Sequence, residues 1–85
     1  MEAKQVGTLI RHTYYDDFLC DQILGPFDVV FPNNTSLGVL QPGRQFELFY
    51  KGRWVKTCLG YNEQSGAFYC DRIGYINPIG MPVRI

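Results

Sequence analysis

The chain has 85 residues, which is enough for one domain but too few for a second hydrophobic core. Hydrophobic residues make up 46% of it and charged residues 19%, a composition that excludes a wholly disordered chain. Eight basic and eight acidic side chains cancel, so the domain lacks the strong positive field of a protein that binds nucleic acid non-specifically.

Strands and turns are predicted along the first half of the chain, because glycine and proline interrupt every segment that could form a long helix. The β-branched run Val6–His12 predicts a first strand, and Pro26–Phe31 predicts a second. Between them, Tyr14–Leu24 has room for one helical turn, and the sequence leaves open whether it is loop, strand or helical turn. A turn at Pro32–Thr35 leads to a candidate short strand at Leu37–Leu40.

The clearest element is a β-hairpin over Gln45–Gly60. Two runs of alternating apolar and polar residues flank Lys51-Gly52, where glycine supplies the positive φ of a two-residue turn. The register that follows pairs Tyr50 with Arg53, Phe49 with Trp54, Leu48 with Val55 and Glu47 with Lys56. Leu48 then faces the core and Trp54 faces away from it.

The remaining segments predict two more strands. Ala67–Arg72 predicts a strand, Gly74–Pro82 an irregular segment, and Val83–Ile85 a last short strand. Because closure removes exposed edges, five or six short antiparallel strands in so small a chain indicate a barrel. We predict one all-β domain over residues 1–85, a small SH3-like barrel with at most one short helical or 3₁₀ turn.

Several short motifs together resemble a known protein family. They are Gly7-Thr8-Leu9, Phe46-Glu47-Leu48, Gly52-Arg53-Trp54-Val55-Lys56-Thr57, Phe68-Tyr69 and Val83-Arg84-Ile85. The family is a domain of unknown function among short proteins of Gram-positive bacteria, often associated with phages and conjugative elements. The resemblance covers residues 37–85 and, weakly, 6–12; the long Tyr14–Asn34 segment departs from it. It implies an SH3-like barrel and a mobile-element origin, and it carries no established activity.

Metal-binding and catalytic signatures are absent from the sequence. The three cysteines, Cys20, Cys58 and Cys70, form no close pair of the kind that zinc sites use. His12 is the only histidine, and no glycine motif for an oxyanion hole accompanies it. We therefore expect no metal, no cofactor and no enzymatic activity.

The expected location is the cytoplasm, without membrane attachment. No apolar run reaches the ~20 residues of a membrane-spanning helix, and the first residues lack the apolar core of a signal peptide. An odd number of cysteines is also unlike a small secreted domain.

Two surfaces are candidates for binding a host protein. The first is an acidic aromatic segment made of Tyr14, Tyr15, Asp16, Asp17 and Phe18. The second is the outer face of the hairpin, with Phe49, Trp54 and Lys56. Aromatic side chains are enriched in interfaces, and acidic ones can occupy a groove that normally holds phosphates. With the mobile-element resemblance, this suggests an inhibitor of a host defence nuclease, such as a CRISPR effector. The competing interpretation of the first segment is a loop packed down by its own aromatic side chains.

The alternative function is binding of single-stranded nucleic acid. Small barrels hold single strands by stacking bases on aromatic side chains and by contacting phosphates with cations. The candidate residues for this function are Arg44, Lys51, Arg53, Trp54 and Lys56. The sequence leaves open whether edge strands of two copies pair to form a homodimer.

Overall fold

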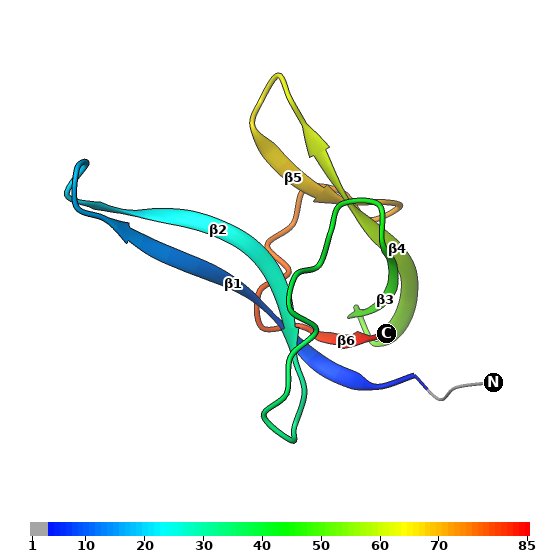
Figure 1. Ribbon diagram of the computed structural model, residues 1–85. Coiled ribbons are helices and arrows are strands. Elements are labelled where there is room, and N and C mark those ends of the chain that lie inside the picture. The colour runs from blue at the N-terminus through cyan, green and yellow to red at the C-terminus, as the bar shows by residue number, and fades with distance from the viewer. Residues whose placement is uncertain (1–3) are drawn as a thin grey trace.

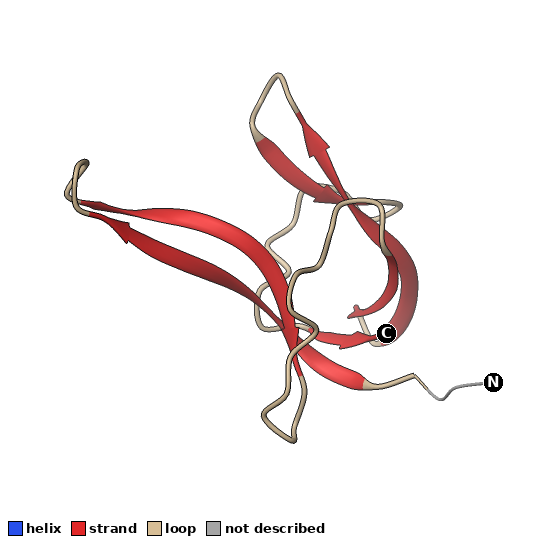
Figure 2. Cartoon of the chain, viewed as in Figure 1, coloured by secondary structure: helices blue, strands red, loops and turns tan. Residues whose placement is uncertain are grey.

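The computed structural model describes residues 4–85 and contains six strands and no helix within that range (Figures 1 and 2). The strands are β1 (Val6–Asp16), β2 (Asp21–Val30), β3 (Gln45–Tyr50), β4 (Arg53–Asn62), β5 (Ala67–Cys70) and β6 (Pro82–Arg84). They form one antiparallel sheet in the order β2-β1-β6-β3-β4-β5. The predicted all-β class is confirmed, although β1, β2 and β4, with 11, 10 and 10 residues, are longer than predicted.

The sheet curls into a half-barrel, consistent with the predicted small SH3-like barrel (Figure 1). Its two edge strands, β2 and β5, do not pair with each other. Instead, Phe27 on β2 and Phe68 on β5 pack edge to face, with ring centroids 5.1 Å apart. Side-chain packing rather than a ladder of hydrogen bonds therefore closes this side of the barrel.

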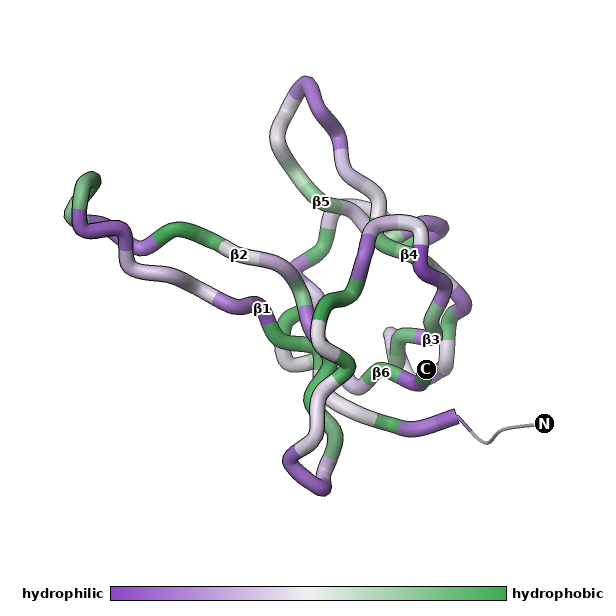
Figure 3. The backbone as a smooth tube through the Cα atoms, viewed as in Figure 1, coloured by the Kyte–Doolittle hydropathy of each residue, from purple (hydrophilic) through white to green (hydrophobic). Residues whose placement is uncertain are grey.

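The hydrophobic core lies inside the curl. Its buried members are Leu9, Phe27, Val29, Leu40, Phe46, Leu48, Leu59, Cys70 and Val83. Alternation along β3 turns Phe46 and Leu48 inward, as predicted from the period of two in that run. Figure 3 shows hydrophobic segments where the strands converge and again at the far tip of the β1/β2 hairpin, well away from the core.

The β3/β4 hairpin confirms the predicted register at every pair from Glu47 to Tyr50. Lys51 and Gly52 have φ angles of 51° and 81°, the two positive values of a type I′ turn. Glu47 and Lys56 face each other as predicted, but they form no ion pair. The carboxylate of Glu47 is held by other cations, described below.

The β1/β2 hairpin shows that Tyr14–Leu24 contains no helical turn. β1 continues past His12 to Asp16, and β2 begins at Asp21, five residues before the predicted strand start. The two strands pair with each other through backbone hydrogen bonds along this extension, which keeps it extended without a core beneath it. A register shift between Arg11 and Thr13 marks where the hairpin leaves the barrel.

The prediction of a strand at Leu37–Leu40 is wrong, because these residues form none. Ser36 forms an isolated bridge with Val30, and Leu40 N then donates to Phe27 O at 2.7 Å. Gly38, with a φ of 104°, interrupts the extended run between these two points. The segment therefore covers part of the outer edge of β2 without forming a strand.

Buried Asp28 fixes that segment to β2. Its side chain is 2% exposed, and Oδ1 accepts hydrogen bonds from Val29 N and from Gly38 N at 3.0 Å. Oδ2 lies 2.8 Å from Nε2 of His12, so both carboxylate oxygens have partners. The only histidine therefore lies within β1 and belongs to this buried network.

The last strands are confirmed with small shifts of their ends. β5 ends at Cys70, two residues early, because Cys70 and Gly74 form an isolated bridge that turns the chain. The segment after Gly74 is irregular, as predicted, and β6 starts one residue early at Pro82. β6 then inserts between β1 and β3, so the first and last strands are neighbours in the sheet.

Candidate functional site

The distal part of the β1/β2 hairpin, residues 13–24, forms an arm that projects from the barrel (Figure 1). The molecule measures 46 × 32 × 22 Å along its principal axes, an elongated shape for a chain of this length. Pairing continues to the tip, where Asp16 faces Asp21 across a four-residue turn. The arm is thus an ordered β-ribbon.

The arm exposes large apolar side chains that contribute little to the core. Phe18 at the tip is 93% exposed. The other exposed members are Tyr14, Tyr15, Leu19, Ile23 and Leu24. Because successive residues of a strand point to opposite faces, this set occupies both faces of the ribbon and its end. An apolar surface so far from the core contributes little to stability, which makes the arm a candidate interaction site.

The acids of the arm have different roles. Oδ1 of Asp16 accepts hydrogen bonds from Phe18 N at 2.8 Å and from Leu19 N at 3.2 Å, so Asp16 shapes the turn. Oδ1 of Asp21 accepts from Gln22 N at 2.8 Å. Among residues 4–85, the carboxylate of Asp17 forms neither a hydrogen bond nor an ion pair, which leaves it available to a partner.

The five arm residues predicted for partner binding therefore lie together, but not equivalently. Tyr14 rests on Gly25, where an added Cβ would collide with its ring, so part of Tyr14 packs within the arm. Tyr15, Asp17 and Phe18 are exposed without such a contact. Sequence reasoning missed Leu19, Ile23 and Leu24, because their exposure becomes apparent only once this segment is known to be a ribbon.

The second predicted surface is the outer face of the β3/β4 hairpin. Phe49 and Trp54 pack edge to face at 5.2 Å between ring centroids. The guanidinium of Arg84 lies over the Trp54 ring, 4.6 Å from its centroid. Trp54 is consequently half-buried, and one side of its ring is already occupied by a cation of the same chain.

Glu47 anchors the cations of this face. Its carboxylate accepts hydrogen bonds from Arg84 and from Lys4. These bonds, Arg84 first and Lys4 second, lower the pKa of Glu47 from its usual 4.5 to about 2. The Arg84 guanidinium that lies over Trp54 is thereby fixed at its other end.

A hollow of about 300 Å³ lies beside Glu47. We call it the basic hollow, and its charged lining residues are Lys4, Arg44, Glu47, Lys56 and Arg84. Among the residues that the structure describes, four cations and one acid line it, so its lining carries a net positive charge. Sequence reasoning missed Lys4 and Arg84, because they come from the two ends of the chain and meet only through the position of β6.

The residues predicted for nucleic-acid binding do not form one contiguous patch. Arg44 and Lys56 line the basic hollow, whereas Lys51 and Arg53 lie at the turn, at the opposite end of the hairpin. Trp54 lies between the two groups. The arm and this hairpin face are also separate surfaces, as Figure 1 shows, so the two halves of the predicted protein-binding site do not meet.

Nothing in the described part of the chain assembles a metal centre. Residues 4–85 hold no cluster of three or more His, Cys, Asp or Glu side chains suited to a metal ion. Cys20 is exposed at the arm tip and Cys58 is half-buried, while Cys70 is buried, and all three thiols are free. Burial, with a smaller effect of Cys58, raises the pKa of the Cys70 thiol. No helix within this range is long and apolar enough to cross a membrane.

Comparison with known proteins identifies a family but no function. No curated protein and no solved structure matches the chain. Residues 18–85 match the domain of unknown function DUF5348, from the tip of the arm to the end of β6. The match begins at residue 18, whereas the main part of the resemblance inferred from short motifs begins at residue 37. Since it covers most of the sequence, the chain belongs to the DUF5348 family.

Proposed function

We propose that this protein is a non-catalytic binding domain that inserts its arm into a groove of a partner protein. The exposure of Phe18, at 93%, is the observation that carries the proposal. A Phe side chain gains about 1.5–3 kcal/mol when it is fully buried, and this domain supplies almost none of that burial. A groove in a partner would supply it for the tip and for both faces of the ribbon.

The negative charge of the arm indicates the charge of the partner groove. The arm, residues 13–24, carries three Asp and no Lys or Arg. The partner groove is therefore basic, with apolar pockets for the aromatic side chains. Such a groove is characteristic of an enzyme that binds a nucleic-acid backbone, for which carboxylates substitute for phosphates.

The partner class follows from this chemistry together with the family resemblance. We propose a host protein as the partner, and specifically a defence nuclease such as a CRISPR effector. The mobile-element origin that the family resemblance implies is the reason for that choice. Under this proposal the protein acts in the cytoplasm and binds its target stoichiometrically.

Site-specific photo-crosslinking in the source cells tests the proposal. A photoreactive phenylalanine replaces Phe18 in one variant and Gln64 in a matched control, since Gln64 is exposed in the turn between β4 and β5. We expect one discrete protein adduct from position 18 and none from position 64. The partner identified by mass spectrometry should then bind purified Asp17→Lys at least tenfold more weakly than wild type, and Arg53→Glu as tightly as wild type. Equal crosslinking from both positions, or equal binding by Asp17→Lys, would contradict the proposal.

A second candidate, single-stranded nucleic-acid binding, is favoured by the basic hollow. Two of its cations, Lys56 and Arg84, share one face of the sheet with the Phe49–Trp54 pair, which offers phosphate contacts beside an aromatic surface. Since Trp54 is the only tryptophan, its fluorescence reports stacking directly. We expect quenching by a single-stranded oligonucleotide, with a log–log salt slope of about −0.7 for each phosphate neutralised.

Two variants separate the candidates. Lys56→Glu reverses a cation of the basic hollow without touching the arm, and Asp17→Lys reverses an acid of the arm without touching the hollow. Nucleic-acid binding should be lost only in the first. A titration without Trp54 quenching or salt dependence would eliminate the second candidate.

A further inference from the structure

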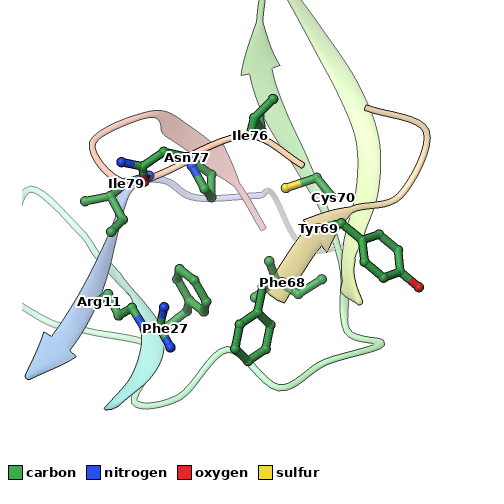
Figure 4. Close-up of a pocket in the computed structure, with 10 residues that line it drawn as sticks. Arg11, Phe27, Phe68, Tyr69, Cys70, Ile76, Asn77 and Ile79 are labelled. Carbon is green, nitrogen blue, oxygen red and sulfur yellow. The ribbon is translucent and has the colours of Figure 1, made fainter. Parts of the chain in front are cut away.

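A small hollow lies between the two edge strands, β2 and β5, which pack through side chains without pairing (Figure 4). Its volume is about 170 Å³. The walls come from β1, β2, β5 and the irregular segment before β6, and they include Arg11, Phe27, Phe68, Cys70, Ile76 and Ile79. We call this site the Arg11 hollow. It shares no residue with the arm, so it stands independently of the function proposed above.

Arg11 occupies a position where the fold would otherwise place an apolar residue. The inward-facing row of β1 runs through Gly7 and Leu9, both buried, to Arg11, which faces Phe27 on β2. Its guanidinium lies over two aromatic rings, 4.7 Å from the centroid of Phe27 and 5.3 Å from that of Phe68. Figure 4 shows the guanidinium beside these rings, toward the space they enclose.

The guanidinium is fixed in place but not neutralised. Nε donates a hydrogen bond to Gly25 O at 2.9 Å. No carboxylate of residues 4–85 forms an ion pair with Arg11. A guanidinium has five N–H donors, and one of them is used here, so the planar fork of terminal nitrogens remains available. That fork matches the geometry of a carboxylate.

The surroundings limit what kind of anion can enter. Within residues 4–85, Arg11 is the only charged residue that lines the hollow, whose other walls are mainly aromatic and aliphatic. A phosphate backbone would need more cations than this one. The volume also lies below the roughly 300–1,000 Å³ of sites for drug-sized ligands. A single carboxylate next to one apolar side chain fits both limits.

The free edge of β5 provides main-chain contacts beside this site. Cys70 and Gly74 exchange N–H···O bonds, at 2.9 Å and 2.8 Å, on the side of β5 away from β4. Because hydrogen-bonding directions alternate along an antiparallel strand, Phe68, two residues earlier, also directs its N–H and C=O away from β4. A peptide can pair with β5 at Phe68, but it must end before Cys70, where Gly74 already occupies the edge.

We propose that the Arg11 hollow binds the C-terminus of a partner peptide. The terminal carboxylate pairs with the Arg11 fork, the last side chain is apolar and fills the hollow, and the preceding main chain adds to the edge of β5 at Phe68. A chain end fits because the edge is blocked beyond this point. It must be the carboxyl end, since an amino terminus would place a second cation against Arg11.

Titration of the ¹⁵N-labelled protein with three pentapeptides of otherwise identical sequence tests this inference. The first ends in Leu with a free carboxylate, the second ends in Leu amide, and the third ends in Leu amide after an internal Asp. We expect the first to shift the Nε–H signal of Arg11 and the amide signal of Phe68. The second and third should bind at least tenfold more weakly.

Three variants locate the interaction. Arg11→Met keeps an unbranched side chain over the rings and should lose at least tenfold in affinity for the free-acid peptide. Arg53→Met, at an exposed position of the β3/β4 turn, should bind like wild type. If Arg11→Met fails to fold, Arg11→Lys keeps the charge without the fork and should still weaken binding severalfold.

Each contrary result overturns the inference. Equal affinity for acid and amide would mean that the carboxylate is not recognised. Equal affinity for the internal-Asp peptide would exclude specific recognition of a chain end. If the Arg11 and Phe68 signals of the wild-type protein do not shift at millimolar peptide, the hollow is not a binding site.

Discussion

Replacement of Phe18 by alanine should leave the stability of the domain almost unchanged, whereas the same substitution at Phe46 should remove a large part of it. Phe18 is 93% exposed and Phe46 is 3% exposed. Full burial of a Phe side chain contributes about 1.5–3 kcal/mol, so the small covered fraction of Phe18 contributes about 0.2 kcal/mol. Truncation of a core Phe costs about 3–5 kcal/mol, because a cavity is added to the lost transfer free energy.

Urea denaturation measures both changes, with Trp54 fluorescence and far-ultraviolet circular dichroism as independent probes. A domain of this length is stabilised by roughly 4–13 kcal/mol in total, so Phe46→Ala removes a large part of it. The midpoint for Phe18→Ala should coincide with that of wild type. A loss above about 1 kcal/mol for Phe18→Ala would show that its ring is packed on the domain in solution, and the arm would then not be an available binding surface.

Three further outcomes follow from buried or paired groups. Asp28→Ala should lower the unfolding free energy by about 2–4 kcal/mol, because backbone N–H groups lose a charged acceptor; a urea midpoint near that of wild type would contradict this. The pKa of Glu47 is about 2 in the folded chain and 4.5 in the unfolded one, so its stabilising effect is complete above pH 4.5 and disappears between pH 4.5 and 2. In Glu47→Gln the melting temperature should change less with pH across that window than in wild type. A pH profile parallel to that of wild type would refute the stabilising role of the Glu47 carboxylate. Ellman's reagent should modify Cys20 rapidly and Cys70 only on unfolding, since burial raises the pKa of the Cys70 thiol; a fast phase that survives Cys20→Ser would refute this order.

The β3/β4 hairpin could be predicted from sequence because its determinants are local. Lys51-Gly52 specifies a turn with two positive φ angles, and the alternating residues on each side then fix the register. A shift of one residue would have exposed Leu48 and buried charged neighbours, so one register is strongly preferred.

The arm could not be assigned from sequence for the opposite reason. Neither of its faces packs on a core, so Tyr14–Leu24 shows no alternation between buried and exposed types. Gly25-Pro26 also resembles a strand boundary, although both residues lie within β2. The ribbon is held by hydrogen bonds between its two main chains, and no side-chain pattern records such bonds.

The basic hollow shows a second limit of sequence reasoning. Glu47 and Lys56 were correctly placed opposite each other, but the carboxylate binds Arg84 from β6 and Lys4 from the first residues. Those partners lie 37 and 43 positions away in the chain. A pairwise argument within one hairpin could not include them, because the neighbour on the other side of β3 was unknown.

β1 joins β2 to the rest of the sheet, even though it precedes the part of the chain that matches the family. It pairs with β2 along most of its length and with β6 at its start, and β2 has no other strand neighbour. A chain that began at residue 18 would leave β2 unpaired, so the folded domain requires residues 6–16. Packing restricts β1 mainly near the barrel, where an added Cβ at Gly7 would lie 2.7 Å from Val30 O and where Leu9 is fully buried. Beyond the register shift at Thr13, β1 contributes mainly backbone hydrogen bonds, and the side chains of the arm are therefore free to match a partner without any change in the fold.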